Sequence, residues 1–550
     1  MRDETEYSWK YWLLLWGLCV SLAVLVVAVF RLTIIQHKYY YGLARENRIY
    51  EGVIPAGRGD VVDRKGRVIA KSVYNYFKKD GDSKIYEGTG EFNGFKFEGK
   101  EIGYDLKRQY LFGEAMGPIT GYINMANQDD LALSRKCGQE LNKSDMVGRS
   151  GIEEAMDCEL RGVDGKRLVE VDALGKYIRE LGRQEPQVGK TVELAIDAFW
   201  QDKVYKMLEG KKGVVIMSEP KTGEIRVMVS SPGFDANVFS YEVDQVKIEE
   251  YLRDSSQTPL LNRAIGARYH PGSVFKMVMA TAGLESGVVD KNYEILDTGI
   301  IKVGDYSYSN WLWSKRGGTD GMVNMIKAIK RSNDIYFYKL GEALGLDRIG
   351  EWSRKFGYGQ KTGIEIGTEA EGIVPSEEWK LKTKGEKWYL GNTYHLSIGQ
   401  GDLSVTPLQV NQMTDIVANG GKKCRPTLLK GKGGECEEVG LKKETINTVI
   451  EGMKEACKNG GTAWPLFNFK TPLACKTGTA EVGDGSKDTH AWLTAFAPAD
   501  DPQISITVMI ERGGEGSDVA APIVGDILKE WLGEPETVVP RYGVTVTPGR

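Results

Sequence analysis

A run of twenty uncharged residues near the N-terminus, Tyr11–Phe30, constrains the structure of this chain more than any other feature of its sequence. As a helix, the run has about the length needed to cross the ~30 Å hydrocarbon core of a membrane. Trp9, Tyr11 and Trp12 suit one membrane interface. The run is long for the apolar part of a cleaved signal peptide, and no small-x-small cleavage site precedes a mature start. We therefore expect residues 1–32 to be a short cytoplasmic tail and a retained single-pass anchor.

The composition of the 550 residues narrows the function. The 72 basic and 76 acidic residues give a formal net charge of −4, which argues against nucleic-acid binding. The four histidines are scattered and no Cys-x-x-Cys pair is present, so we expect neither a metal site nor a cofactor. Outside the apolar run six cysteines remain, an even number that suits an exported protein.

The pattern of the remaining chain predicts an α+β protein. We place a domain boundary just before the alternating segment Thr191–Asp197. Residues 33–190 then form a membrane-proximal domain, residues 191–533 a larger domain, and residues 534–550 a C-terminal tail. In the larger domain, helices lie between early and late strands, which favours a mostly antiparallel sheet flanked by helices. The expected strands are 213–217, 224–229, 471–480, 491–497 and 504–510, and the expected helices are 325–344, 445–456 and 519–532.

The segment Tyr269–Lys276 is the main candidate for a catalytic motif. A Pro-Gly pair predicts a turn, and Ser273 stands where a helix begins, with apolar residues at helical spacing after it. Lys276 lies one turn further on, and burial can depress the pKa of such an amine until it serves as a base. A second Ser-x-x-Lys, Ser218–Lys221, lies in a predicted hairpin turn, so the pair alone is weak evidence.

Two further polar motifs follow along the chain. Ser332-Asn333-Asp334 lies near the start of the helix predicted over residues 325–344, where such residues are more often an N-cap and its first-turn acid. Lys-Thr-Gly occurs three times, but only Lys476-Thr477-Gly478, which continues with Thr479, lies on a predicted strand. The order of the three motifs and their local structure make them specific together.

In this order, Ser273-x-x-Lys276, Ser332-x-Asp334 and Lys476-Thr477-Gly478 resemble the three motifs of the penicillin-binding proteins and class A β-lactamases. The likeness covers nearly the whole chain. Four other segments are similar to class B penicillin-binding proteins: Arg58–Ala70, Val147–Glu153, Leu168–Asp172 and Pro259–Ala264. Two more, Leu344–Trp352 and Ser397–Gly401, are similar to the elongation-type penicillin-binding protein 2. That group carries an aspartate where most relatives have asparagine in the second motif. The resemblance implies an elongated pedestal before the catalytic domain, although Ser72–Met146 is unlike the family.

The resemblance implies a D,D-transpeptidase that crosslinks peptidoglycan stem peptides and is acylated by β-lactams. Ser273 is then the nucleophile, and Lys276, held neutral by burial, accepts its proton. Ser332 relays a proton toward the leaving or attacking amine. Asp334 holds Lys276 or the substrate amide in place.

The third motif is expected to bind the donor peptide. Lys476 supplies positive charge for the terminal carboxylate, and Thr477, Gly478 and Thr479 lie beside it. By resemblance, the backbone N–H groups of Ser273 and Thr479 form the oxyanion hole.

The resemblance also implies a location and partners. The catalytic domain is expected on the periplasmic, extracytoplasmic side of the cytoplasmic membrane, although the charges beside the anchor do not decide the orientation. The expected partners are a SEDS-type membrane glycosyltransferase and the elongation machinery. Two alternatives stay open: a β-lactam-hydrolysing or β-lactam-sensing protein with the same motifs, and a mainly non-catalytic activator of the glycan polymerase.

A disulfide beside the third motif is the last expectation. Cys457 follows the helix predicted over 445–456, and Cys475 lies on the strand of Lys476. If helix and strand pack together, the two sulfurs can meet and stiffen that strand. A short-range pair of Cys424 with Cys436 competes with this pairing.

Overall fold

The computed structural model describes residues 4–46, 49–80, 83–90, 102–132, 137, 141–143, 145–171, 177–241 and 243–534. The chain forms two compact units. Residues 1–57 with 161–189 make up one, named here the anchor unit, and residues 58–160 with 190–550 make up the other, named the main unit. Along the chain, the divisions between the units fall after Gly57, Leu160 and Gly189, so residues 58–160 group with the candidate catalytic motifs.

Backbone pairing explains why residues 58–160 belong to the main unit. Strand β2 (Val61–Val62) pairs in parallel with β10 (Val192–Glu193), and the Arg64 N–H donates to the Ile196 carbonyl. The Asn237 side chain accepts from the backbone N–H of Tyr110 and donates to its carbonyl. These long-range bonds tie the segment to the chain beyond residue 190.

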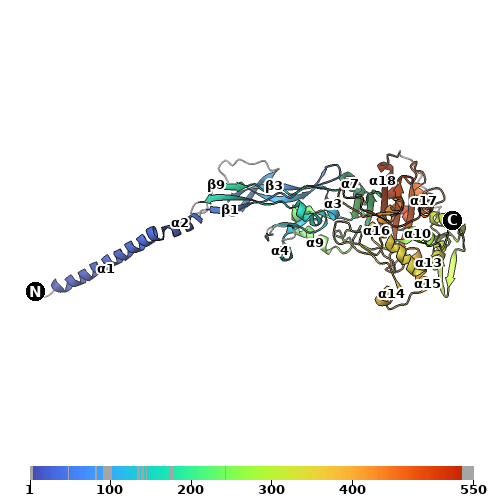
Figure 1. The fold of residues 1–550 in the computed structure, drawn as a ribbon, viewed down its shortest axis with the longest axis horizontal. Coiled ribbons are helices and arrows are strands. Elements are labelled where there is room, and N and C mark those ends of the chain that lie inside the picture. The colour runs from blue at the N-terminus through green and yellow to red at the C-terminus, as the bar shows by residue number, and fades with distance from the viewer. Residues whose placement is uncertain are drawn as a thin grey trace, which may run out of the picture. The chain divides into compact units, whose positions relative to one another are not determined.

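The anchor unit holds the apolar helix and a small sheet. Helix α1 (Glu4–Phe30) runs into a π-helical turn, Arg31–Ile35, and then into α2 (His37–Glu46), as Figure 1 shows in blue. Among the described helices, one span, Trp9–Ile35, is long and apolar enough to cross a membrane. The antiparallel sheet has the order β1-β8-β9, with bounds Ile49–Ile54, Gly165–Val171 and Tyr177–Gln184.

A second sheet opens the main unit. Its order is β10-β2-β3-β4, with β5 also paired to β3. A turn at Lys65-Gly66 joins β2 to β3, and Gly66 has a positive φ of 81°. The remaining bounds of this region are β3 Val68–Asp80, β4 Ser83–Gly90, β5 Ile102–Tyr110, α3 Gly113–Thr120, β6 Ile123–Met125, α4 Gln128–Ala132, β7 Met146–Gly148, α5 Gly151–Ala155 and α6 Asp157–Leu160.

A buried ionic cluster ties this region together. Glu153 is fully buried, and its two carboxylate oxygens accept from Arg108 at 2.7 Å and from Arg58 at 2.5 Å. Burial raises the pKa of Glu153, but the two guanidinium groups outweigh it and leave the pKa below its ordinary value. The cluster joins three segments that are distant in the sequence.

The central sheet of the main unit has five antiparallel strands in the order β12-β11-β21-β20-β19. Their bounds are β11 Gly213–Ser218, β12 Ile225–Ser231, β19 Ala474–Glu481, β20 Thr489–Ala497 and β21 Ile504–Ile510, so all five predicted strands are present. Apolar residues of α7 (Ala198–Met207) and α18 (Ala521–Trp531) pack against one face. Helices α10 (Lys276–Glu285) and α16 (Pro407–Ala418) contribute to the core on the other face. Strand β19 is an edge strand.

The helices beside β19 carry the other motifs. A 3-10 turn, Gly272–Phe275, leads into α10, and α12 (Met325–Arg331) packs on α17 (Lys443–Ala456). Helix α13 (Asp334–Lys355) packs on α15 (Leu390–Ser397). The other elements are α8 Asn237–Ser240, α9 Gln245–Arg253, β13 Ile295–Asp297, β14 Ile300–Val303, β15 Tyr306–Ser309, α11 Trp311–Arg316, β16 Gly321–Val323, α14 Glu377–Lys384, β17 Lys422–Cys424, β18 Cys436–Glu438, the 3-10 turn Trp464–Leu466 and the π turn Gly516–Ala520.

The helix predicted over residues 325–344 is not continuous. Ser332 adopts the left-handed conformation, with φ 52° and ψ 41°, and ends α12. Asn333 is extended and caps α13 by accepting from the Tyr336 N–H. The N-cap is therefore Asn333 and not Ser332, and the second motif lies at a break between two helices.

The structure contains the favoured disulfide. Cys457 and Cys475 are bonded, with a Cα separation of 5.9 Å, because α17 packs beside β19 as expected. The competing pair Cys424–Cys436 is bonded as well, across β17 and β18, so the two pairings do not exclude each other. A third disulfide joins Cys137 and Cys158.

Candidate active site

The turn that carries Ser273 lies between two other backbone segments. Gly272 has a φ of 56°, and a Cβ at this position would lie 2.7 Å from the Thr479 carbonyl oxygen. The Gly272 N–H donates to the Gly399 carbonyl at 2.9 Å, and a Cβ on Gly399 would lie 2.2 Å from the Gly272 oxygen. Only glycine fits at both positions. The Ser397–Gly401 loop and β19 therefore fix the position of the serine.

Lys276 is the first residue of α10 and is fully buried. Its Nζ donates to Asp334 Oδ1 at 2.6 Å, to the Ser332 carbonyl at 2.9 Å and to Ser332 Oγ at 3.3 Å. Ser273 is half-buried, and its hydroxyl makes no hydrogen bond with any residue in the described part of the chain. The second motif thus holds the lysine, while the serine hydroxyl stays free for a substrate.

Lys476 contacts the same Ser332 hydroxyl as Lys276 does. It is fully buried, and its Nζ donates to Ser332 Oγ at 2.8 Å and to the Thr477 carbonyl at 2.7 Å. Ser332 Oγ therefore accepts hydrogen bonds from two lysine amines. Its own proton is left to point elsewhere, which suits a group that passes protons on.

Burial governs the charge of the two amines. Burial lowers the pKa of Lys276, and the attraction of Asp334 only partly offsets it. The pKa of Lys476 lies well below its usual value because the amine is buried and because the charge of Lys276 repels it. Two buried amines share one carboxylate, so the site favours one neutral amine, the form that a general base requires.

The remaining residues of the third motif lie in order along β19. Thr477 is buried and its hydroxyl donates to Thr462 Oγ1 at 2.7 Å. Gly478 packs closely, since a Cβ there would lie 3.0 Å from the Trp492 Cβ. Thr479 is exposed, and its Oγ1 accepts from the Gly516 N–H at 3.4 Å. The structure thus brings the three motifs together: Ser332 joins Lys276 to Lys476, and the turn before Ser273 packs on Thr479.

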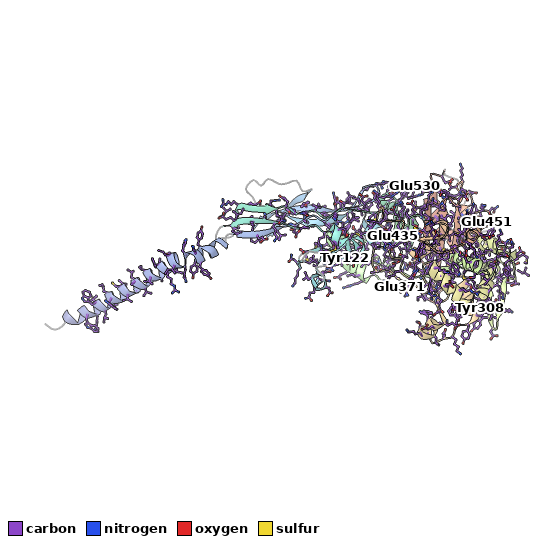
Figure 2. The ribbon with its side chains drawn as sticks, viewed as in Figure 1. Tyr122, Tyr308, Glu371, Glu435, Glu451 and Glu530 are labelled. Carbon is purple, nitrogen blue, oxygen red and sulfur yellow. A yellow bond between two sulfur atoms is a disulfide. The ribbon has the colours of Figure 1, made fainter. Side chains whose placement is uncertain are left out.

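An aromatic cluster supports the loop next to the nucleophile. Tyr308 of β15, labelled in Figure 2, lies edge-on to Tyr394, with ring centroids 5.0 Å apart. Tyr338 stacks on the same Tyr394 ring, and Ile398 packs against this cluster. Helices α13 and α15 are thereby joined beneath the Ser397–Gly401 loop.

Sequence reasoning missed several residues of the site. Thr462 follows two glycines and carries no motif, and nothing in its surroundings in the sequence connects it with Thr477. Gly399 belongs to the segment Ser397–Gly401, whose only signal in the sequence is its family resemblance. Among the described residues, no group of three His, Cys, Asp or Glu side chains is placed to hold a metal.

A serine at the start of a helix, a buried lysine one turn later, and a hydroxyl held between two lysine amines define an active-serine acyltransferase. The family model of the penicillin-binding protein transpeptidase domain matches residues 213–529, and that of the penicillin-binding protein dimerisation domain matches residues 83–194.

Known proteins are similar to this chain over most of its length. It is 30% identical to the peptidoglycan D,D-transpeptidase MrdA of Haemophilus influenzae, over 96% of this chain and 92% of that protein. The penicillin-binding protein 2 (PBP2) of Helicobacter pylori, solved in complex with MreC, superposes with a TM-score of 0.76 at 28% identity, covering 88% of this chain and 99% of that one. A chain from a peptidoglycan synthase complex gives a TM-score of 0.77 at 27% identity, covering 96% and 99%.

The chain therefore belongs to the penicillin-binding protein transpeptidase family, as a class B member of the elongation-type PBP2 group.

Proposed function

We infer that the chain is a peptidoglycan D,D-transpeptidase that crosslinks stem peptides during cell elongation. The observation that carries this is the hydroxyl of Ser332, which accepts from Lys276 on one side and from Lys476 on the other, in a site where Ser273 lies one turn before Lys276. This arrangement can move a proton between a serine nucleophile and an amine. Membership of the transpeptidase family supplies the substrate class.

The first half-reaction transfers the donor peptide to the enzyme. Ser273 Oγ attacks the carbonyl between the two terminal D-alanines, and its proton passes to the neutral amine of Lys276. The proton then moves through Ser332 Oγ to the nitrogen of the departing D-alanine, as the C–N bond breaks. Asp334 keeps Lys276 in place throughout, at 2.6 Å.

The second half-reaction forms the crosslink. The amine of a neighbouring stem peptide attacks the acyl carbon and gives up a proton through Ser332 to Lys276. The ester bond to Ser273 breaks, and the serine oxygen recovers its proton from Lys276. The same residues thus act in both directions.

The third motif binds the donor and stabilises the oxyanion. The terminal carboxylate of the donor brings a negative charge to Lys476, which favours the protonated form of this amine and leaves Lys276 as the neutral one. Thr477 and Thr479 flank Lys476 on β19. The carbonyl of Thr479 faces Gly272, and since the N–H and C=O of one strand residue point to the same side, its N–H faces the nucleophile turn as well. We assign the oxyanion hole to this N–H and that of Ser273.

A stem pentapeptide tests the function. The purified full-length chain should release D-alanine from a peptide that ends in D-Ala–D-Ala. When an acceptor stem peptide is added, it should form a crosslinked dimer of the two peptides. A Ser273→Ala variant should release none. Absence of D-alanine release from the unaltered chain would reject the transpeptidase. Rapid hydrolysis of penicillin with no crosslinking would favour a β-lactam hydrolase instead.

The location and the partners follow from the substrate. Stem peptides lie outside the cytoplasmic membrane, so we place the main unit on the extracytoplasmic side, anchored by residues 11–30. The similar PBP2 was solved with MreC, and another similar chain comes from a peptidoglycan synthase complex. We therefore propose elongation proteins, including a SEDS-type glycosyltransferase, as partners. The test is a reporter protein that functions only in the cytoplasm, fused after Arg550. Activity of this reporter would contradict the proposed orientation.

A further inference from the structure

The break between α12 and α13 places Ser332 in an unusual backbone conformation. Ser332 has a positive φ of 52°, which residues with a side chain rarely adopt. This conformation directs its carbonyl to the amine of Lys276 at 2.9 Å and its hydroxyl to both Lys276 and Lys476. Something must hold the turn in place, because serine alone does not favour it.

Asn333, the residue after Ser332, is held firmly by the hydrogen bonds of its own side chain. It is fully buried, and its Oδ1 accepts from the Tyr336 N–H at 2.9 Å. Its Nδ2 donates to Asp297 Oδ2 at 2.9 Å and to Asp320 Oδ2 at 3.1 Å. Both amide protons and the carbonyl oxygen are therefore used.

Asp297 is the fixed point of this network. Only 2% of it is exposed, and its Oδ2 also accepts from Asn310 Nδ2 at 2.9 Å and from the Asp320 N–H at 2.8 Å. Its other oxygen accepts from the Gly299 N–H at 2.8 Å. The four donors, counting Asn333, arrive from different segments and leave the carboxylate little freedom.

The same network reaches the other side of the motif. Asn310 Oδ1 accepts from the Asp334 N–H at 3.2 Å, and Asp334 Oδ2 accepts from the Trp311 N–H at 2.9 Å. The segment from β13 to α11 thus holds Asp334 as well as Asn333. Ser332 therefore lies between Lys276 and Lys476, and the two residues that follow it are held by this segment.

We propose that Asn333 is a positioning residue, whose amide, held by Asp297, keeps Ser332 in the left-handed turn and its hydroxyl between the two lysines. This rests on the proposed function, since it gives Ser332 its proton path. Asn333 itself touches no reacting atom.

Acylation kinetics test the proposal. The full-length chain is mixed with a fluorescent penicillin over a range of concentrations, which separates the limiting acylation rate from the half-saturating concentration. Asn333→Asp keeps the size and the helix cap but turns a donor into a carboxylate facing Asp297. It should lower the limiting rate at least about tenfold and leave the half-saturating concentration unchanged, because a small displacement of a catalytic group suffices for such a loss. Asn324→Asp, the same change at the cap of α12, should leave both quantities unaltered.

Two double variants separate positioning from general loosening. If Asn333 acts through Ser332, adding Asn333→Asp to Ser332→Ala should slow acylation no further. Asn333→Asp combined with Asp297→Asn should slow acylation no more than Asn333→Asp alone, because both changes break the same amide–carboxylate contact. Asn333→Ser, which keeps a short cap but loses the amide, decides the question if the charged variant does not fold.

Three results would overturn the proposal: a wild-type limiting rate in both Asn333 variants, a further slowing of Ser332→Ala, or an equal loss in binding and rate. None of these results bears on the proposed transpeptidase function, provided that the unaltered chain is acylated on Ser273 and that Ser332→Ala is acylated slowly. An unaltered chain that takes up no penicillin would instead reject the proposed function itself.

Discussion

Replacing Asp334 by asparagine tests the proton balance of the site most sharply. The Asp334 carboxylate lies 2.6 Å from the buried amine of Lys276 and is the anion that favours its charged form. Asparagine keeps a hydrogen-bond acceptor of the same size and removes the charge. Because the change alters neither the size nor the shape of the side chain, the variant should fold.

The expected magnitude follows from the distance. An opposite charge within about 4–6 Å changes a pKa by about 1–3 units, and each unit corresponds to about 1.4 kcal/mol. Without Asp334, the ammonium form of Lys276 loses this support, so the pKa of Lys276 falls further. Acylation needs the neutral amine and therefore rises as pH passes this pKa. The acid limb of the acylation rate should move to lower pH by about one to three pH units.

The assay is the second-order acylation rate with a fluorescent penicillin between pH 4 and pH 10, for the wild-type chain and Asp334→Asn. Asp197→Asn is the matched control, because it removes a carboxylate from Lys65, at 2.8 Å, which belongs to none of the three motifs. The control should leave the limb where it is in the wild type. An acid limb that stays in place in Asp334→Asn, or moves to higher pH, would refute the assignment of Lys276 as the base.

Three other predictions concern the base, a disulfide and the ionic cluster. Lys276→Arg should lower acylation by at least about 100-fold, since a guanidinium does not give up its proton, and a near-normal rate would remove Lys276 from the mechanism. Cys457→Ala with Cys475→Ala opens a loop with a separation of 18 residues and should lower the free energy of unfolding in urea by about 3 kcal/mol; an unchanged value would contradict this. Glu153→Gln removes the anion that two buried arginines share, leaving Arg58 only Asp157, and should cost about 3–5 kcal/mol in the same assay, where a loss below about 1 kcal/mol would speak against the cluster.

Local patterns in the sequence were enough for most of the fold. The five strands of the central sheet alternate or form apolar runs bounded by turns, and each was predicted close to its observed bounds. The pairing of Cys457 with Cys475 also followed from neighbouring elements. Such features depend on residues that lie near one another in the chain.

The missing parts depend on residues that are far apart in the sequence. The helix break at Ser332 is stabilised by Asn333, whose partner Asp297 lies 36 positions earlier. Thr462 meets Thr477 only because α17 returns beside β19. The grouping of residues 58–160 with the catalytic motifs rests on the pairing of β2 with β10. No local periodicity encodes these contacts, so only the folded structure reveals them.

The position of the penicillin adduct tests the central claim most directly. The full-length chain is incubated with penicillin, digested, and the modified peptide is identified by mass spectrometry. We predict one adduct, on Ser273, that persists long enough to be isolated and is absent from Ser273→Ala. An adduct on another serine, or an adduct of the same mass on Ser273→Ala, would contradict the active site described here.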